Sequence, residues 1–185
     1  MVLLQSNPGE TGSAAIDFKL KGIDGKIYSL DTFVSKSVIV LIFMCNHCPY
    51  VQAVVKRLIS LQSKFEDKSV QLIGISSNDV ESYPEDSFEN MIIFSKERKI
   101  NFPYLIDENQ STAKNYDAVC TPDIYLYDCS RTLKYRGRLD DNWKDEDKVK
   151  NKDLELAIEA VLENKEITRE QIPSMGCSIK WKKLN

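Results

Sequence analysis

Histidine is nearly absent from this chain: there is one in 185 residues, and the sequence also lacks a long apolar run and a concentration of positive charge. No apolar stretch reaches membrane-spanning length, so no transmembrane helix is predicted. A net charge of −3 without a basic stripe argues against nucleic acid as a partner. Residues 1–15 lack the basic and apolar regions of a secretory signal, so we expect a cytoplasmic protein that does not bind membranes.

Five cysteines make an odd number in a chain for which an intracellular location is expected, so a rigid disulfide framework is not predicted. The odd number favours redox or metal-binding roles for the thiols instead. The length and a hydrophobic content of 42% suit one soluble domain with a proper core. We therefore expect a single domain over residues 1–165 and a C-terminal tail, residues 166–185, packed on it.

The chemistry of the chain concentrates in the stretch Cys45-Asn46-His47-Cys48-Pro49, which holds the only histidine and two of the five cysteines. The apolar run 38–43 leads into it, and a helical pattern over 50–65 leads away. A C-x-x-C pair at a strand-to-helix junction is typical of a thiol–disulfide redox site. Backbone N–H groups at a helix start have no intrahelical partner, so they stabilise a thiolate there.

Hydrophobic periodicity predicts an α/β protein with a mixed sheet. The predicted strands are a hairpin with arms at 18–20 and 27–30, buried strands at 38–43 and 70–75, a short extended piece at 102–105, and a pair at 124–127 and 133–138. Helices are predicted at 50–65, 86–100, 109–116 and 154–162. A right-handed crossover places the start of the first helix at the carboxyl end of a strand, where open α/β sheets hold their sites.

An ordered set of motifs resembles the thioredoxin fold and, within it, the AhpC/TSA or peroxiredoxin-like family. The motifs are Phe43-Met44-Cys45-Asn46-His47-Cys48-Pro49-Tyr50-Val51, Ser77-Asn78-Asp79, Phe102-Pro103-Tyr104-Leu105-Ile106-Asp107-Glu108, Cys120-Thr121-Pro122-Asp123, Tyr135-Arg136-Gly137-Arg138-Leu139-Asp140-Asp141-Asn142 and Gly176-Cys177-Ser178-Ile179-Lys180-Trp181-Lys182. The resemblance covers nearly the whole chain. It implies a thioredoxin-like α/β fold in which helices flank both faces of a mixed central sheet, with an N-terminal β-hairpin and an extended C-terminal tail.

The resemblance also implies roles for three residues. In thioredoxin-like proteins the proline of the Thr-Pro pair is cis and packs beside the dithiol, which is the position of Pro122. Thr121 would present its backbone to a bound peptide or thiol, so that both residues shape a substrate groove. In peroxiredoxins the cysteine followed by proline reacts with the peroxide, and Cys48 occupies that place.

Three features depart from these families. Cys45 stands where a peroxiredoxin has a threonine that positions the peroxide. Neither Arg136 nor Arg138 can be assigned by motif as the arginine of that site. The apolar run before Cys45 also lacks the buried acid with which thioredoxins shuttle protons, so the proton relay stays unassigned.

The first prediction is a thiol–disulfide oxidoreductase that cycles Cys45 and Cys48 between dithiol and disulfide. The first sulfur of a C-x-x-C on a helix start is the exposed one as a rule, so Cys45, its pKa lowered from about 8.5, is expected to attack. Cys48 then resolves the mixed disulfide, and a cationic His47 stabilises the thiolate. The expected partners are a protein or small-molecule disulfide and an unidentified cellular reductant, and no cofactor is expected.

Two alternatives use the same residues. In a thiol peroxidase with an antioxidant role, Cys48 would reduce a peroxide through a sulfenic acid and then form a disulfide with Cys45. In a metal-binding module, Cys45, His47 and Cys48 would be joined by Cys120 or Cys177 in a tetrahedral site. Three ligands so close in sequence are cramped, and no second C-x-x-C or distant histidine supports the site, so no metal is expected.

Two of the other three cysteines keep two interpretations each. Cys120 precedes the Thr-Pro pair and is either a third redox partner or a small buried hydrophobe. Cys177 lies in the tail, which could fold back to resolve an oxidised Cys48 or serve packing alone. Cys129, in a turn, is interpreted as a bystander. A catalytically idle scaffold that binds partners through the groove is the remaining hypothesis.

Overall fold

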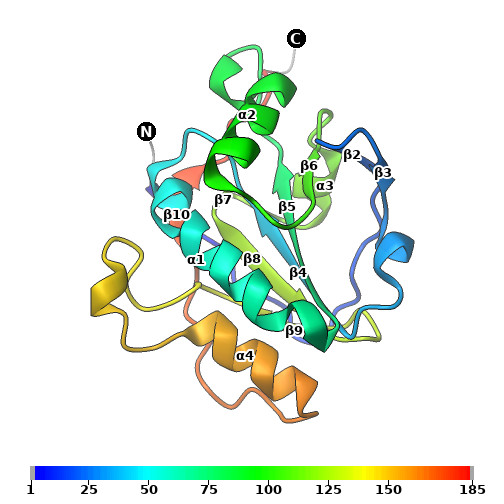
Figure 1. Ribbon diagram of the computed structural model, residues 1–185, viewed down its shortest axis with the longest axis vertical. Helices are drawn as coiled ribbons and strands as arrows, with labels where there is room; N and C mark the ends of the chain where they lie inside the picture. The colour runs from blue at the N-terminus through cyan, green and yellow to red at the C-terminus, as the bar shows by residue number, and fades with distance from the viewer. Residues whose placement is uncertain (1–2, 184–185) are drawn as a thin grey trace.

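The centre of the fold is β4 (Val38–Phe43), a strand in which every residue is buried. It pairs in parallel with β5 (Val70–Ser76) and antiparallel with β8 (Asp123–Tyr127), so both of its backbone edges are hydrogen-bonded. The structure is a computed structural model that describes residues 3–183 (Figure 1). Residues 1–2 of the expected domain and 184–185 of the expected tail lie outside the described residues.

Within the described residues, the main sheet has seven strands in the order β3-β2-β6-β5-β4-β8-β9. Its remaining strands are β2 (Leu20–Gly22), β3 (Ile27–Tyr28), β6 (Tyr104–Ile106) and β9 (Leu133–Arg136). β2 and β3 form the predicted antiparallel hairpin, whose turn holds Gly25 at a φ of 83°, a conformation that favours glycine. Parallel and antiparallel pairings occur side by side, which confirms the expected mixed central sheet.

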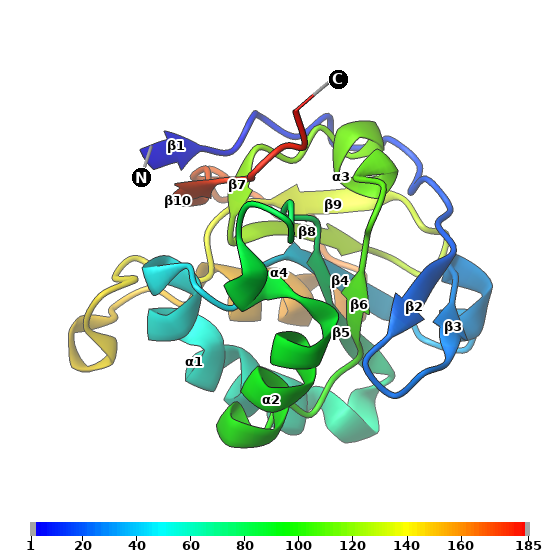
Figure 2. The same cartoon turned by 90° about the horizontal axis from the view of Figure 1, so that it is seen from above.

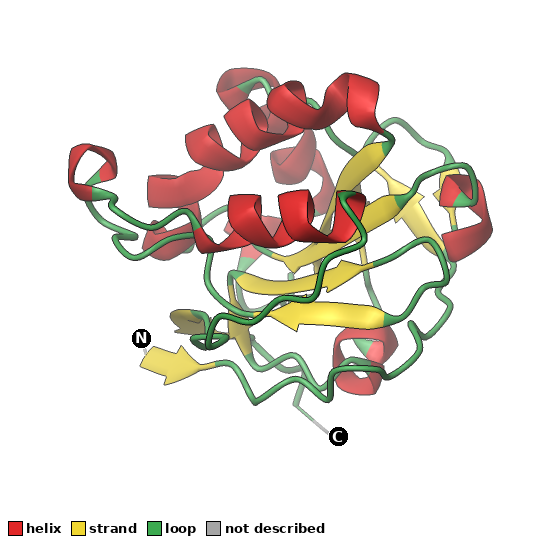
Figure 3. Cartoon of the chain, turned by 90° about the horizontal axis from the view of Figure 1, so that it is seen from below, coloured by secondary structure: helices red, strands yellow, loops and turns green. Residues whose placement is uncertain are grey.

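Alternating side chains of β4 face two cores, one on each side of the sheet. The even-numbered residues pack with α1 (Pro49–Phe65), α2 (Phe88–Arg98) and α4 (Asp153–Leu162). The odd-numbered residues face the short helices η1 (Leu30–Phe33) and α3 (Ser111–Asn115). Figures 2 and 3 show the longer helices gathered on one side of the strands. The expectation that helices flank both faces is therefore confirmed.

A second sheet joins distant parts of the chain, with the order β1-β10-β7 among the described residues (Figure 2). Its strands are β1 (Leu3–Gln5), β10 (Met175–Ser178) and β7 (Cys120–Thr121). The tail, expected to be merely extended, therefore contributes a strand that pairs antiparallel with β7. A Cβ on Gly176 would lie 1.9 Å from the carbonyl oxygen of Thr121, so this close approach requires glycine.

The second helix begins at Phe88 rather than at the predicted residue 86, because Ser87 is its N-cap and accepts a hydrogen bond from the backbone N–H of Asn90. Asp86 instead ends the 3₁₀ helix η3 (Pro84–Asp86). Two further 3₁₀ helices are η2 (Glu66–Lys68) and η4 (Glu146–Lys148). Among residues 3–183, no helix combines the length and apolarity that crossing a bilayer requires. Asp86 therefore precedes the helix, and its side chain contacts backbone N–H groups of the C-x-x-C loop.

Candidate functional site

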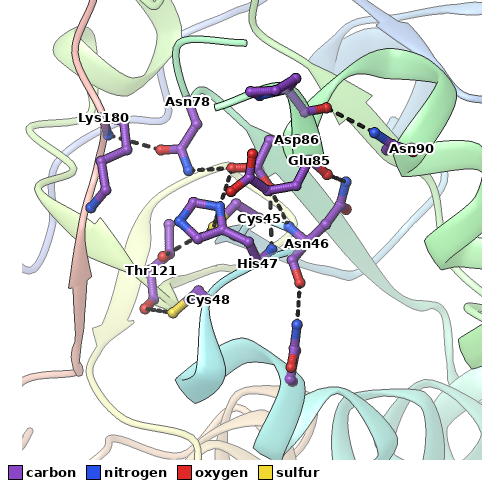
Figure 4. A network of polar contacts seen from close by, with 12 residues as sticks. Cys45, Asn46, His47, Cys48, Asn78, Glu85, Asp86, Asn90, Thr121 and Lys180 are labelled. Atoms are coloured by element: carbon purple, nitrogen blue, oxygen red, sulfur yellow. Dashed lines mark hydrogen bonds and ion pairs between the residues drawn. The ribbon is translucent and has the colours of Figure 1, made fainter. Parts of the chain in front are cut away.

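The C-x-x-C stretch lies between the end of β4 and the start of α1, as the sequence predicts (Figure 4). Cys48 is the N-cap of α1 and Pro49 is its first residue, a position where the missing N–H of proline costs nothing. The Cys48 sulfur accepts a hydrogen bond from the backbone N–H of Val51 in the first turn. The sulfur thus lies at a helix start, where unpaired N–H groups favour a thiolate.

Both sulfurs of the pair are buried, since Cys45 is 1% and Cys48 0% exposed. The expectation of an exposed Cys45 is therefore wrong. The physical reason is packing, because both cysteines belong to the core cluster that also contains Val51 of α1 and Cys177 of β10. The side chain of His47, which lies between the two cysteines in the sequence, is 16% exposed.

The two thiols differ in acidity in the opposite sense to the one expected. A hydrogen bond from the Cys45 thiol, with further ones from Thr121 and Val51, lowers the pKa of Cys48 to about 5 against the opposing effect of burial. The same contact with Cys48, together with burial, raises the pKa of Cys45 well above its ordinary value. Cys48 is therefore the more acidic thiol of the pair, and the expectation of a lowered pKa at Cys45 is wrong.

Thr121 contacts both sulfurs. Its hydroxyl oxygen lies 3.6 Å from Cys45 Sγ, and its carbonyl oxygen accepts from the Cys48 thiol, when that thiol is protonated, at 3.1 Å. The Thr121–Pro122 peptide bond is cis, as the resemblance implied. Pro122 lines a hollow of about 220 Å³. Other residues of that wall include Val54, Trp143 and Met175. The substrate groove stays a prediction, in which Pro122 faces the hollow and Thr121 faces the sulfurs.

His47 is held by an acid from another part of the chain. Its Nδ1 lies 2.6 Å from Asp86 Oδ2 and 4.0 Å from Cys45 Sγ. The imidazole stacks on Tyr83, with ring centroids 5.4 Å apart and an interplanar angle of 8°. The hydrogen bond with Asp86 raises the pKa of His47 above its ordinary value, although burial opposes it. The imidazole is thus paired with a carboxylate that favours its protonated form, and it lies within reach of Cys45.

Asp86 is a buried acid beside the C-x-x-C loop that the sequence did not indicate, and the proton relay itself stays unassigned (Figure 4). Its Oδ1 accepts from the backbone N–H groups of Asn46 at 2.8 Å and His47 at 3.2 Å. Its Oδ2 accepts from Asn78 Nδ2 at 2.7 Å and from the His47 ring. Burial raises the pKa of Asp86, but these hydrogen bonds outweigh it and lower the pKa below its ordinary value. The carboxylate therefore orients the loop between the two cysteines.

Sequence reasoning missed Asp86 because it lies 39 positions from His47 and belongs to no shared motif. One usable signal was the Ser77-Asn78-Asp79 stretch, which follows the buried strand β5. Polar residues at the carboxyl end of a parallel strand lie at the edge where α/β sheets hold their sites. Asn78 is the member of this stretch that contacts Asp86.

One group of metal-ligating type occurs among the described residues: Cys45, His47 and Asp86, whose ligand atoms all lie within 4.8 Å of one another. It differs from the predicted ligand set, because Asp86 takes part and Cys48, Cys120 and Cys177 do not. The Asp86 oxygens each already accept two hydrogen bonds. A carboxylate with that many donors is satisfied without a cation, so the arrangement fits a hydrogen-bonded loop better than a metal centre.

The fold brings one of the remaining cysteines to the pair. The Cys177 thiol hydrogen-bonds the Cys48 sulfur, whereas the buried Cys120 thiol is directed at the carbonyl oxygen of Pro122 at 3.8 Å. Burial raises the pKa of both thiols, that of Cys177 to about 12. Cys129 is exposed, in keeping with its interpretation as a bystander.

Both arginines considered for a peroxiredoxin-like site are paired with carboxylates. Arg136 contacts the buried Asp123 at 2.9 Å, and Arg138 contacts Asp153 at 2.6 Å. The assignment left open by the sequence therefore finds no support at either position. The basic side chain that contacts the dithiol loop is His47, whose Nδ1 lies 4.0 Å from Cys45 Sγ.

Fold and site together define a class, that of thioredoxin-like α/β proteins with a thiol pair at the start of the first long helix. The AhpC/TSA family model matches residues 11–136, which is more than half of the chain, and the chain belongs to this family. Peroxiredoxin Q, chloroplastic, of Oryza sativa subsp. japonica is 30% identical over 105 residues, 57% of this chain and 45% of the rice protein. The chain spans between 45% and 66% of the length of the curated relatives it matches.

Solved structures support the fold. An uncharacterized conserved protein from Geobacillus kaustophilus is 41% identical, with a TM-score of 0.94 over 100% of this chain and 99% of that one. Peroxidoxin BcpB from Mycobacterium tuberculosis is 17% identical, with a TM-score of 0.59 over 86% of this chain and 98% of that one, and it shows the fold alone. The thioredoxin-like fold class is therefore confirmed, whereas membership of a C-x-x-C subgroup stays a prediction.

Proposed function

We propose that the protein is a thiol peroxidase in which Cys48 reduces a hydroperoxide and Cys45 resolves the product. The observation that carries the proposal is the position of the Cys48 sulfur, which is 0% exposed, lies at the start of α1 and accepts hydrogen bonds from the Cys45 thiol and the Val51 N–H that lower its pKa. Membership of the AhpC/TSA family and similarity to Peroxiredoxin Q support it. Pro49 follows Cys48 directly, as in peroxiredoxins.

Burial favours a small oxidant over a protein disulfide. A thiolate that attacks a disulfide must meet one of its sulfurs directly, so a protein substrate has to bring its backbone up to the attacking sulfur. With Cys45 at 1% and Cys48 at 0% exposure, that approach requires part of the domain to open. Hydrogen peroxide is little larger than water, so small local fluctuations are enough to admit it.

The proposed reaction balances in three steps. The Cys48 thiolate attacks one peroxide oxygen, the O–O bond breaks, and the leaving hydroxide takes a proton to become water. The Cys45 thiol then attacks the sulfenic sulfur of Cys48, and its proton leaves with the hydroxide as a second water while the disulfide forms. A cellular thiol reductant finally returns both sulfurs to thiols and is itself oxidised, so two electrons pass to each peroxide.

The surroundings of Cys45 suit the second step. Its pKa is raised chiefly by the hydrogen bond to Cys48, a cause that disappears once Cys48 is an uncharged sulfenic acid. Burial and the charge of Asp86 still raise the pKa of Cys45, whereas the Thr121 hydroxyl at 3.6 Å lowers it and favours a Cys45 thiolate. The resolving thiol is thus held protonated until its target has formed.

The test is peroxide consumption by reduced Cys48→Ser and Cys45→Ser proteins at equimolar hydrogen peroxide. We expect Cys48→Ser to lose at least about two orders of magnitude in rate, because the nucleophile is gone. Cys45→Ser should consume the first equivalent at a near wild-type rate and should yield no Cys45–Cys48 disulfide. Cys129→Ser, at an exposed position, is the matched control and should behave as wild type. The reverse ranking of the two serine variants would refute the assignment.

Thiol–disulfide exchange is the second candidate, because the two sulfurs of the C-x-x-C are hydrogen-bonded to each other. The same proteins can be offered a small aromatic disulfide and a disulfide-bonded protein. The peroxidase proposal expects the protein disulfide to react most slowly of all the oxidants, because both sulfurs are buried. Faster reaction with the protein disulfide than with hydrogen peroxide would establish exchange as the function.

A further inference from the structure

A third thiol lies beside Cys48, supplied by a segment far away in sequence. β10 pairs with β7 so that Cys177 stands opposite Thr121. The carbonyl oxygen of Thr121 is 3.1 Å from Cys48 Sγ, so the register of this pairing brings Cys177 to the dithiol. The thiol of Cys177 hydrogen-bonds the Cys48 sulfur. Cys48 therefore has two thiol neighbours, Cys45 in its own loop and Cys177 in the tail strand.

Close packing of β10 against β7 fixes the position of Cys177. Gly176 allows β10 to approach β7 to a distance that any side chain would prevent, since an added Cβ would lie 1.9 Å from the Thr121 carbonyl oxygen. Cys177 is 2% exposed and belongs to the same core cluster as Cys45 and Cys48. β1 pairs with the opposite edge of β10, with Leu3 as the partner of Cys177.

Hydrogen bonds beyond the strand hold the tail in place. The backbone N–H of Lys180 donates to Asn78 Oδ1 at 2.9 Å, and the backbone N–H of Asp79 donates to the Lys180 carbonyl oxygen at 2.8 Å. Asn78 itself donates to Asp86, the acid that orients the C-x-x-C loop. The tail and the loop are thus fixed relative to one another, as a reaction between their sulfurs requires.

We propose that Cys177 is a second resolving thiol, which attacks the sulfenic acid of Cys48 and forms a Cys48–Cys177 disulfide. The inference rests on the proposed peroxidase function, which supplies the sulfenic acid. The sulfur of Cys177 bonds to the sulfur of Cys48, the S–O bond breaks, and the thiol proton leaves with the hydroxide as water. The Cys45 thiol can then exchange with this disulfide, which releases Cys177 and leaves the Cys45–Cys48 disulfide without any further oxidant.

Electrostatics assist the proposed attack. Burial and the hydrogen bond to Cys48 both raise the pKa of Cys177 while Cys48 is a thiolate. Oxidation to the uncharged sulfenic acid removes the contribution of that negative charge. Lys180 lies near enough for its charge to lower the pKa of Cys177, so a cation favours the thiolate that the step requires.

Cys120 provides a matched control, because it is equally buried but differently directed. Its thiol points at the carbonyl oxygen of Pro122 at 3.8 Å, and it lies outside the core cluster that joins the other three thiols. Cys120 and Cys177 stand on neighbouring strands, so serine at either position places a hydroxyl in the same part of the protein. Only the loss of Cys177 should change the chemistry of Cys48.

The experiment uses full-length Cys45→Ser protein, alone and combined with Cys177→Ser or Cys120→Ser. Each reduced protein receives one equivalent of hydrogen peroxide and is quenched with acid and an alkylating reagent, with and without a sulfenic-acid trap of the dimedone type. We expect Cys45→Ser to lose the mass of two hydrogens and to yield a linked Cys48–Cys177 peptide. The variant that also lacks Cys177 should lose this link and accumulate trapped sulfenic acid, whereas the Cys120→Ser combination should resemble Cys45→Ser.

The outcomes separate the two proposals. Equal sulfenic-acid trapping with and without Cys177, and no linked peptide, would overturn the role of Cys177 while leaving the peroxidase intact. Absence of sulfenic acid in every variant would mean that the peroxidase fails. Diamide, which oxidises dithiols without peroxidase chemistry, then tests the pairing alone: a Cys48–Cys177 link supports it and its absence overturns it. Consumption of the first peroxide equivalent by the variant without Cys177 shows that its site is folded.

Discussion

At the scale of single residues, one carboxylate organises the redox loop. Asp86 accepts hydrogen bonds from two successive backbone N–H groups between the cysteines, those of Asn46 and His47, and from the side chains of His47 and Asn78. The loop is further tied by Asn46, whose side chain accepts from the Tyr104 hydroxyl at 3.0 Å. Replacing Asp86 therefore disturbs the geometry of the thiol pair without touching either sulfur.

We predict that Asp86→Asn lowers both the stability of the fold and the pKa of His47. The neutral amide is a weaker acceptor, and leaving buried donors poorly satisfied costs about 1–3 kcal/mol, which urea unfolding measures. Loss of the anionic partner removes the main cause that raises the pKa of His47. His47 is the chain's only histidine, so a single imidazole signal in an NMR titration reports its pKa. An unchanged midpoint would contradict the pairing.

The same pair predicts how stability varies with pH. His47 has a folded pKa above its unfolded value of about 6.5, so its contribution is complete below that pH and is lost as pH rises through the folded pKa. The folded pKa of Asp86 is lowered, so its contribution is complete above about 3.9 and is lost as pH falls through the folded value. Unfolding free energies of wild type and His47→Gln should therefore converge as pH rises above neutrality. A constant gap between them would contradict the ion pair.

How far the site could be predicted differs from residue to residue. The C-x-x-C motif and the Thr-Pro pair placed Cys45, Cys48 and Thr121 together, because the resemblance carries their spatial relation. The motif did not determine which sulfur is the more acidic, since that depends on hydrogen bonds formed in the folded chain, first from Cys45 and then from Thr121 and Val51. Asp86 was missed because its contact with the loop forms only in the folded chain.

At the scale of elements, prediction succeeded where the pattern is long. β4 and α1 have the predicted positions because an apolar run and a helical repeat of that length have few other interpretations. β7 and β10 were not predicted, because segments of two and four residues carry no usable periodicity. They are strands because pairing with each other satisfies their backbone groups. The sequence therefore led to the expectation that the tail packs on the domain, but it did not reveal that the tail forms a strand paired with β7 beside the dithiol.

The β10–β7 pairing can be tested through Gly176. We predict that Gly176→Ala destabilises the fold by about 1–3 kcal/mol or more, because the added Cβ meets backbone and a backbone atom must move. Because the displaced strand carries Cys177, the substitution should also make Cys48 react faster with a bulky thiol reagent. Ser178→Ala on the same strand is the control: it removes only a hydroxyl that accepts a hydrogen bond from Lys180, so it should destabilise the fold less than Gly176→Ala does. Wild-type stability and thiol reactivity in Gly176→Ala would contradict the close approach.

At the scale of the whole molecule, the fold separates the thiols by access. Cys129 is exposed, whereas Cys45, Cys48, Cys120 and Cys177 are buried. Apolar side chains pack on both faces of the sheet. A reagent larger than a peroxide therefore reaches the buried thiols only when part of the domain opens. Reactivity of these thiols should therefore depend on the size of the reagent as well as on thiol acidity.

We predict that the native reduced protein shows one fast-reacting thiol with a bulky aromatic disulfide reagent, and that the others follow slowly. Cys129→Ser should remove the fast phase without changing peroxide consumption, because Cys129 is the exposed cysteine. Mild urea should accelerate the slow phase by favouring local opening. A buried thiol that reacts as fast as Cys129 would show that the dithiol is open to large molecules.

The side-chain amide of Asn78 connects Asp86, beside the C-x-x-C loop, with the C-terminal tail. Its amide nitrogen donates to Asp86 and its oxygen accepts from the backbone N–H of Lys180. A single side-chain amide is therefore in contact with both Asp86, which holds the C-x-x-C loop, and the C-terminal tail. In a ¹⁵N-labelled sample, this side-chain resonance becomes a built-in spectroscopic reporter. Its displacement on oxidation would reveal whether a change of two electrons at sulfur is felt at the end of the chain, with no probe attached.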